Sequence, residues 1–116
     1  MITNQEKLEK IFNILVKKYN LTLKKSLVAC YNDFDILIVM NNKLYFVIPY
    51  IEYNDGKPHI SLKGAYYIYL ENELVPFYKK CKKEIEEIIY RYKSLFLKLK
   101  ELEIKHRIIN MGKDFE

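Results

Sequence analysis

The chain has 116 residues, half of them hydrophobic, and a formal net charge of +5 at pH 7. This apolar content excludes an intrinsically disordered chain, and the length suits one domain that buries a modest core without disulfides or metal. The apolar runs fall far below the roughly 20 residues that span a bilayer, and the first residues lack the basic-then-apolar order of a signal peptide. We therefore expect a single domain over residues 1–116 that is cytoplasmic and does not enter a membrane.

A first helix is expected over residues 4–19. Leu8, Ile11, Phe12 and Leu15 recur at spacings of three and four, which places them on one face of a helix. Thr3 followed by a glutamate three residues later fits a capping box at its start. This helix should pack its apolar face on a sheet.

From residue 21 to residue 70 the hydrophobic period shifts toward two, which predicts strands. Runs rich in β-branched and aromatic residues cover residues 27–31, 34–40, 45–53 and 59–70. Asn41-Asn42 and the segment 54–57 suit tight hairpins with positive φ. Pro49 cannot donate to a ladder, so its strand should lie at an edge or carry a bulge there. The sequence thus predicts an antiparallel meander of about four strands.

Residues 75–109 carry the longest periodic signal, with apolar side chains at heptad spacing, and predict a long amphipathic C-terminal helix. The fold class is therefore α+β, with two helices on one face of the sheet. Such a helix would be roughly 50 Å long, whereas a compact domain of this size has a radius of gyration of only about 13 Å. Part of the stripe should stay uncovered, so we expect a homodimer through its second half. The expected interface consists of Tyr92, Leu95, Phe96, Leu99, Leu102 and His106.

Lysines crowd the start of this helix, where the macrodipole already presents partial positive charge. Together with free backbone N–H groups they would suit a phosphate or nucleic-acid backbone, although the glutamates that follow favour an ordinary solvated face. Tyrosines of the last predicted strand share a face with a lysine, and aromatics beside lysines suit base stacking, with core packing or a protein interface as the alternative. The candidate nucleic-acid or anion site comprises Lys63, Tyr67, Tyr69, Lys79, Lys80, Lys82 and Lys83.

Two aspartates raise a metal-dependent nuclease as a further alternative. Over residues 8–50, the order of helix, strand, Asp-headed strand, Asn-Asn turn and apolar strand resembles the hairpin of the PD-(D/E)xK nucleases, particularly the archaeal Holliday-junction resolvases. In that resemblance Asp33-Phe34-Asp35 takes the place of the metal-binding Pro-Asp, and Ile48-Pro49-Tyr50 stands where the family has Glu-x-Lys. Without that carboxylate and lysine the site could neither hold Mg²⁺ properly nor activate water. The resemblance therefore implies a catalytically dead relative rather than an active nuclease.

Other chemical signatures are missing from the sequence. Cys30 and Cys81 are isolated and indicate small buried hydrophobes, and His59 and His106 show no metal-ligand spacing. The three glycines form no phosphate-binding motif, and no Ser or Cys has an elbow motif around it. We expect no catalytic residue, no metal and no cofactor.

Three classes of function remain compatible with the sequence. The first is a non-enzymatic interaction protein, a homodimer that presents a Tyr- and Lys-rich surface to a macromolecule. Accessory proteins of viruses and mobile elements are often small interaction proteins of this kind, which makes a host protein one expected partner. The second class is a nucleic-acid binder that uses the lysines at 79–83, and the third is the nuclease-like domain.

Overall fold

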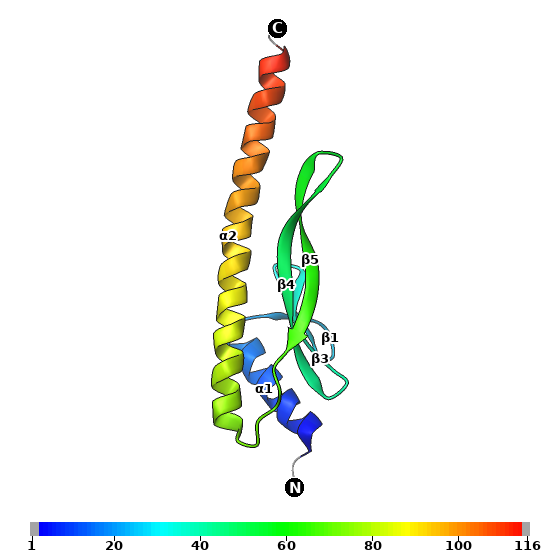
Figure 1. Cartoon of the computed structure of the whole chain (residues 1–116), viewed down its shortest axis with the longest axis vertical. Coiled ribbons are helices and arrows are strands. Elements are labelled where there is room, and N and C mark those ends of the chain that lie inside the picture. The colour runs from blue at the N-terminus through cyan, green and yellow to red at the C-terminus, as the bar shows by residue number, and fades with distance from the viewer. Residues whose placement is uncertain (1–2, 115–116) are drawn as a thin grey trace.

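The computed structural model describes the backbone of residues 3–114 and the side chains of residues 3–105. Its five strands form one antiparallel sheet in the order β1-β2-β3-β4-β5, which confirms the α+β class and the meander (Figure 1). The sheet has one strand more than expected, because the β1 residues Thr-Leu-Lys-Lys are all exposed and show no apolar alternation. In chain order the elements are α1 (Asn4–Lys18), β1 (Thr22–Lys25), β2 (Val28–Tyr31), β3 (Phe34–Met40), β4 (Lys43–Asn54), β5 (Lys57–Tyr67) and α2 (Leu74–Asp114).

Local chemistry fixes the start of α1 and the tight turns. The Thr3 hydroxyl accepts a hydrogen bond from the Glu6 N–H at 3.1 Å, as the capping box predicts. The turn between β3 and β4 places Asn41 and Asn42 at φ 54° and 57°, and the turn between β4 and β5 places Asp55 and Gly56 at 51° and 78°. Asn, Asp and Gly tolerate this region best, so the predicted hairpins are confirmed. The register of β4 and β5 shifts at Pro49, which confirms the predicted bulge.

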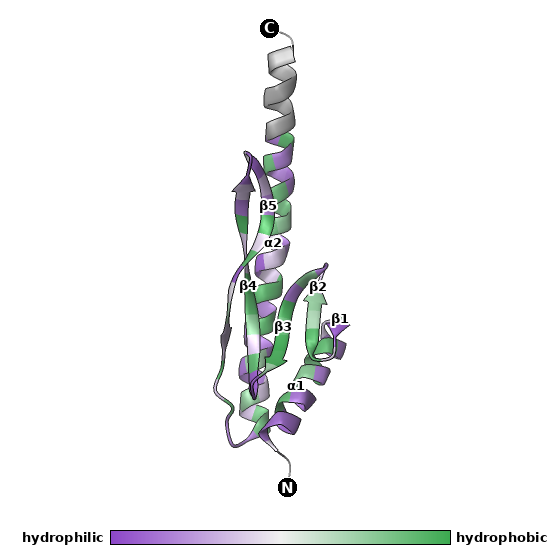
Figure 2. Ribbon diagram, turned by 90° about the vertical axis from the view of Figure 1, so that its right-hand side faces the viewer, coloured by the Kyte–Doolittle hydropathy of each residue, from purple (hydrophilic) through white to green (hydrophobic). Residues whose placement is uncertain are grey.

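Both helices pack against the same side of the sheet, α1 against β3 and β4 and α2 against β4 and β5 (Figure 1). Leu37 and Phe46 are paired across β3 and β4 and belong to the buried core. Tyr66 pairs with Phe46, and its hydroxyl donates to Glu84 of α2 at 2.6 Å. These residues lie on what we call the helix face. Their alternating neighbours lie on the opposite side, the open face, which Figure 2 views with α2 behind it.

The molecule is a rod, with principal extents of 73 × 21 × 21 Å and a radius of gyration of 18.1 Å. A compact domain with this number of residues would have a radius of gyration of about 13 Å. The helix α2 causes the elongation, since its 41 residues run without a break past the sheet. The β4–β5 hairpin runs alongside α2. Its strands have 12 and 11 residues, and at a rise of about 3.3 Å per residue they extend far beyond their neighbour β3. The chain therefore covers more of its own helix than the sequence led us to expect.

The described residues, 3–114, include no helix that combines the length and apolar character required to cross a membrane.

Candidate binding surfaces

Four side chains gather on the open face where β4 and β5 lie next to each other. Tyr45 and Tyr67 are cross-strand partners, and their rings meet edge to face with centroids 5.5 Å apart. Tyr69, just past the end of β5, packs against Tyr67 in the same manner at 5.3 Å. The Lys43 ammonium lies 4.4 Å from the centre of the Tyr67 ring, within the range of a cation–π contact. We call Lys43, Tyr45, Tyr67 and Tyr69 the open-face cluster.

Contacts within the open-face cluster shift the pKa values of two of its tyrosines. Hydrogen bonding with Tyr69 lowers the pKa of the Tyr67 phenol, and the charge of Lys43 lowers it further. The same interaction raises the pKa of the Tyr69 phenol. Tyr69 is 78% exposed, so its ring is available to a ligand. Beside it lies a hollow of about 230 Å³ that Asn42, Lys43, Tyr67 and Tyr69 line together with three apolar residues. The cluster thus offers an aromatic surface, a cation and a recess.

The predicted lysines at the start of α2 do not join this cluster. They belong to α2, which packs on the helix face, whereas Tyr67 and Tyr69 lie on or next to the open face. Two of the four are partly neutralised, because Lys80 pairs with Glu71 and Lys82 lies 4.0 Å from Glu86. Lys79 and Lys83 are exposed. Lys63 is exposed at the β5 bulge, four residues before Tyr67. The structure therefore divides the predicted site into two separate surfaces.

The apolar stripe of α2, which carries the predicted dimer interface, lies mostly inside the chain. Tyr92 is fully buried, packs against Tyr31 and Phe34, and donates its hydroxyl to the Asp35 carbonyl at 3.1 Å. Leu95, Phe96 and Leu99 are partly buried against the same core, and the Phe96 ring packs against Tyr31 and Phe34. Leu102 is partly buried, and the His106 side chain lies outside the described residues.

A second apolar line runs along the outer side of α2. Tyr90, Leu97 and Ile104 stand at exact heptad spacing and are 74%, 66% and 54% exposed. Because α2 has about 3.6 residues per turn, these three residues point the same way, away from the buried stripe. We call them the α2 ridge. Exposed residues of both charges surround the ridge, namely Glu86, Glu87, Arg91, Lys93, Lys98, Lys100, Glu101 and Glu103.

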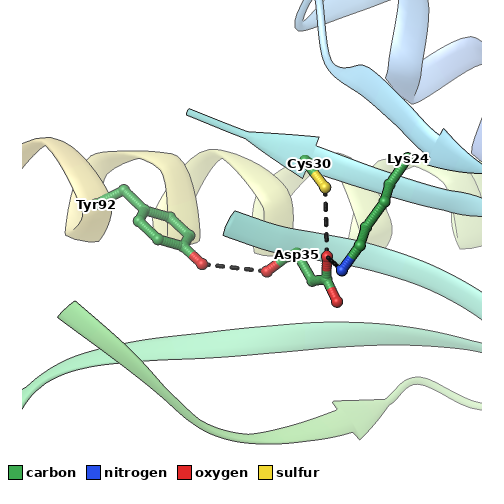
Figure 3. Close-up of polar contacts among 4 residues, drawn as sticks. All are labelled: Lys24, Cys30, Asp35 and Tyr92. Carbon is green, nitrogen blue, oxygen red and sulfur yellow. Dashed lines mark hydrogen bonds and ion pairs between the residues drawn. The ribbon is translucent and has the colours of Figure 1, made fainter. Parts of the chain in front are cut away.

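The aspartates of the nuclease resemblance have local structural partners. Asp33 lies in the β2–β3 turn at φ 70°, a conformation that favours Asp or Asn. The Asp35 carboxylate accepts a hydrogen bond from the Cys30 thiol at 3.3 Å and lies 3.6 Å from the Lys24 ammonium (Figure 3). Burial and this hydrogen bond raise the pKa of Cys30, so the thiol stays protonated. Among residues 3–105, no three His, Cys, Asp or Glu side chains come together in a way that could hold a metal ion.

Both cysteines are buried and free, as expected for small hydrophobes. Burial raises the pKa of the Cys81 thiol to about 12, far above the range of a nucleophilic cysteine. Comparison with protein-family models, with curated proteins and with solved structures finds no match to this chain.

Sequence reasoning found Tyr67 and Tyr69 but did not place Lys43 and Tyr45 beside them. The Asn41-Asn42 turn was the available signal, because it sets Met40 opposite Lys43 and Ile38 opposite Tyr45. The further step to Tyr67 depends on the register of β4 and β5, which a bulge shifts. The alternation of apolar and polar residues along one strand does not reveal how a bulge shifts its register with the next strand.

Proposed function

We propose that this chain is a small non-enzymatic binding protein, and that the macromolecule it binds at the open-face cluster is single-stranded nucleic acid. The observation that carries the proposal is the grouping of Tyr45, Tyr67 and Tyr69 with Lys43 on the sheet face opposite the one against which α1 and α2 pack. Single-stranded nucleic acids are commonly bound by aromatic side chains that stack on bases beside cations that contact the backbone.

Each member of the cluster has a distinct role in this proposal. Tyr69 is the most exposed ring and stacks on a base. Tyr45 and Tyr67 meet edge to face and hold one another in position, which limits the rotamer freedom lost on binding. Lys43 approaches a phosphate from above the Tyr67 ring. The recess of about 230 Å³ beside Tyr69 receives part of a second nucleotide.

The test is anisotropy of labelled single-stranded oligothymidylate and oligouridylate over a series of salt concentrations. We expect binding that weakens with salt, because counterions are released from the backbone. Lys43→Gln should lower the slope of log affinity against log salt by about 0.7, the value for one contact on a single strand. Lys57→Gln is the matched control, since Lys57 is exposed at the far end of the β4–β5 hairpin.

Two results would count against the proposal. Absence of binding at low salt would favour the other reading of the same surface, a protein interface. Cleavage of the oligonucleotide that requires Mg²⁺ or Mn²⁺ and is lost in Asp35→Ala would contradict a non-enzymatic role and revive the nuclease resemblance.

We also propose that the protein self-associates through the α2 ridge, as a homodimer. Tyr90, Leu97 and Ile104 support this proposal, because large apolar side chains at heptad spacing on an exposed helix commonly pack against another helix. Exposed lysines and glutamates both flank the ridge, so the charges there neither strongly favour nor strongly oppose the contact. The association should therefore depend mainly on the apolar side chains and change little with salt.

Leu97→Glu should convert this dimer to a monomer without unfolding it, since Leu97 is 66% exposed. Light scattering behind a sizing column, at two salt concentrations, measures the mass. Leu23→Glu is the control, because Leu23 is 55% exposed on the edge strand β1. A wild-type mass of one chain at both salt concentrations would contradict the dimer.

A further inference from the structure

A groove lies between α1 and the first turns of α2, apart from the open-face cluster and the α2 ridge. It has a volume of about 280 Å³, and all but one of its lining residues are apolar or aromatic. Ile14 is 40% exposed and Val75 is 64% exposed, although both line this hollow. The lining residues are Lys10, Ile11, Ile14, Leu74, Val75 and Tyr78. We call this feature the interhelical groove.

Lysines border the interhelical groove on both sides. On a helix, residues four apart are neighbours on one surface. Lys10 and Lys18 are each one turn from Ile14, and Lys7 is one turn from Ile11. On α2, Lys79 lies four residues after Val75, and Lys82 lies four residues after Tyr78. Both belong to the group of lysines at 79–83 described from the sequence.

Acidic groups offset part of this charge. Glu86 lies 4.0 Å from Lys82, which it partly neutralises, and accepts a hydrogen bond from the Tyr19 hydroxyl at 2.5 Å. Glu73 is exposed next to the lining residue Leu74 and adds one negative charge. Glu71 pairs with Lys80, which lies outside the groove border. The groove therefore combines an apolar floor with a predominantly basic rim.

We propose that the interhelical groove docks an acidic amphipathic α-helix of another protein. Amphipathic helices bind in such grooves through apolar anchors spaced three and four residues apart. The volume of about 280 Å³ is at the lower limit of small-molecule pockets, which enclose about 300–1,000 Å³, and suits a few inserted side chains. The basic rim selects carboxylates beside those anchors.

A second copy of this chain suits the groove less well than an acidic helix does. The exposed apolar residues of α2 that could enter the groove are those of the α2 ridge, and side chains of both charges flank them. Part of that contact would place lysines against the lysines of the rim, whereas an acidic helix places carboxylates there. This proposal also gives a role to Lys79, whose positive charge near a helix N-terminus is unfavourable in isolation.

The experiment uses the full chain and two labelled synthetic helical peptides of about 20 residues, or about 30 Å. Both carry leucines at heptad a and d positions; one has glutamates at the flanking positions and the other has lysines. Anisotropy at low salt should show binding of the acidic peptide alone. The double variant Ile14→Lys with Val75→Lys should weaken it by at least about tenfold, as expected for loss of central anchors.

Charge reversal provides the decisive comparison. Lys10→Glu with Lys79→Glu should weaken the acidic peptide and allow the basic peptide to bind, a switch that simple damage to the fold cannot produce. Tyr90→Lys, on the same helix but outside the groove, should leave acidic-peptide binding unchanged, and circular dichroism confirms that each variant is folded.

The proposal is overturned if the acidic peptide fails to bind, if it binds the Ile14→Lys, Val75→Lys variant equally well, or if charge reversal does not change the preference. Binding of anionic phospholipid vesicles that depends on Ile14 and Val75, without peptide binding, would also overturn it and assign the groove to a membrane surface. Tyr67→Leu with Tyr69→Leu should not affect the peptide, which keeps this test separate from the proposed nucleic-acid function.

Discussion

Replacing Tyr92 with alanine should destabilise the protein by about 3–5 kcal/mol, the usual cost of removing a large buried aromatic side chain. Tyr92 is completely buried and packs against Tyr31, Phe34 and Phe96. Its hydroxyl also satisfies the Asp35 carbonyl. Small domains are stable by only about 5–15 kcal/mol in total, so the variant should be marginally folded. Urea unfolding followed by circular dichroism measures the loss.

Two variants separate the contributions at this position. Tyr92→Phe keeps the ring but removes the hydrogen bond to Asp35, and should cost about 1 kcal/mol. Tyr90→Ala is the control, because Tyr90 is two residues away on the exposed side of α2 and should change stability by no more than about 0.5 kcal/mol. If Tyr92→Ala unfolded like the wild type and only altered the mass in solution, the stripe would be an intermolecular surface after all.

The double substitution Tyr67→Leu with Tyr69→Leu should weaken binding of single-stranded oligonucleotides by at least about 30-fold. Stacking of a base on an aromatic side chain contributes about 1–3 kcal/mol, and two rings are removed. Tyr69 is largely exposed and Tyr67 has no place in the buried core, so the fold should tolerate the change. Anisotropy with the same labelled oligonucleotides measures the effect.

Phenylalanine substitutions at the same two positions distinguish stacking from hydrogen bonding. Tyr67→Phe with Tyr69→Phe retains both rings and should keep most of the affinity. Tyr53→Leu is the positional control, because Tyr53 is 58% exposed near the tip of the β4–β5 hairpin, away from the cluster. Equal loss of affinity in the Phe and Leu double variants would rule out base stacking as the source of binding.

Local signals in the sequence predicted the helix starts, the turns and an antiparallel meander. The capping threonine of α1, the Asn-Asn turn and the bulge at Pro49 each depend on a few adjacent residues, and each is present in the structure. Strand β1 escaped prediction because its pairing with β2, and not its own side chains, makes it a strand. The helix α2 extends to Asp114, past the predicted end at residue 109.

The heptad stripe shows where sequence reasoning reaches its limit. The periodicity identified correctly that Tyr92, Leu95, Phe96 and Leu99 share one face of a helix. It could not reveal what covers that face, because the covering side chains, among them Tyr31 and Phe34, come from strands distant in the sequence. The expected radius of gyration was that of a compact domain, whereas the molecule is a rod.

The candidate surfaces were only partly accessible from the sequence, since each combines separate segments. The open-face cluster joins residues from β4 and from the end of β5, and the interhelical groove joins Ile14 of α1 with Val75 of α2. The lysines at 79–83 were noticed as a group, yet the structure gives them different surroundings. Lys79 and Lys82 border the groove, whereas Lys80 pairs with Glu71.

Mapping of amide chemical shifts, while single-stranded oligonucleotide is added to the ¹⁵N-labelled protein, tests the central proposal most directly. We predict shifts at Ile38, Lys43, Tyr45, Tyr67 and Tyr69 on and beside the open face, with little change at Ile14 and Val75 in the interhelical groove. Shifts concentrated at residues 79–83, or no shifts at all at low salt, would contradict the assignment of the open face as the nucleic-acid-binding surface.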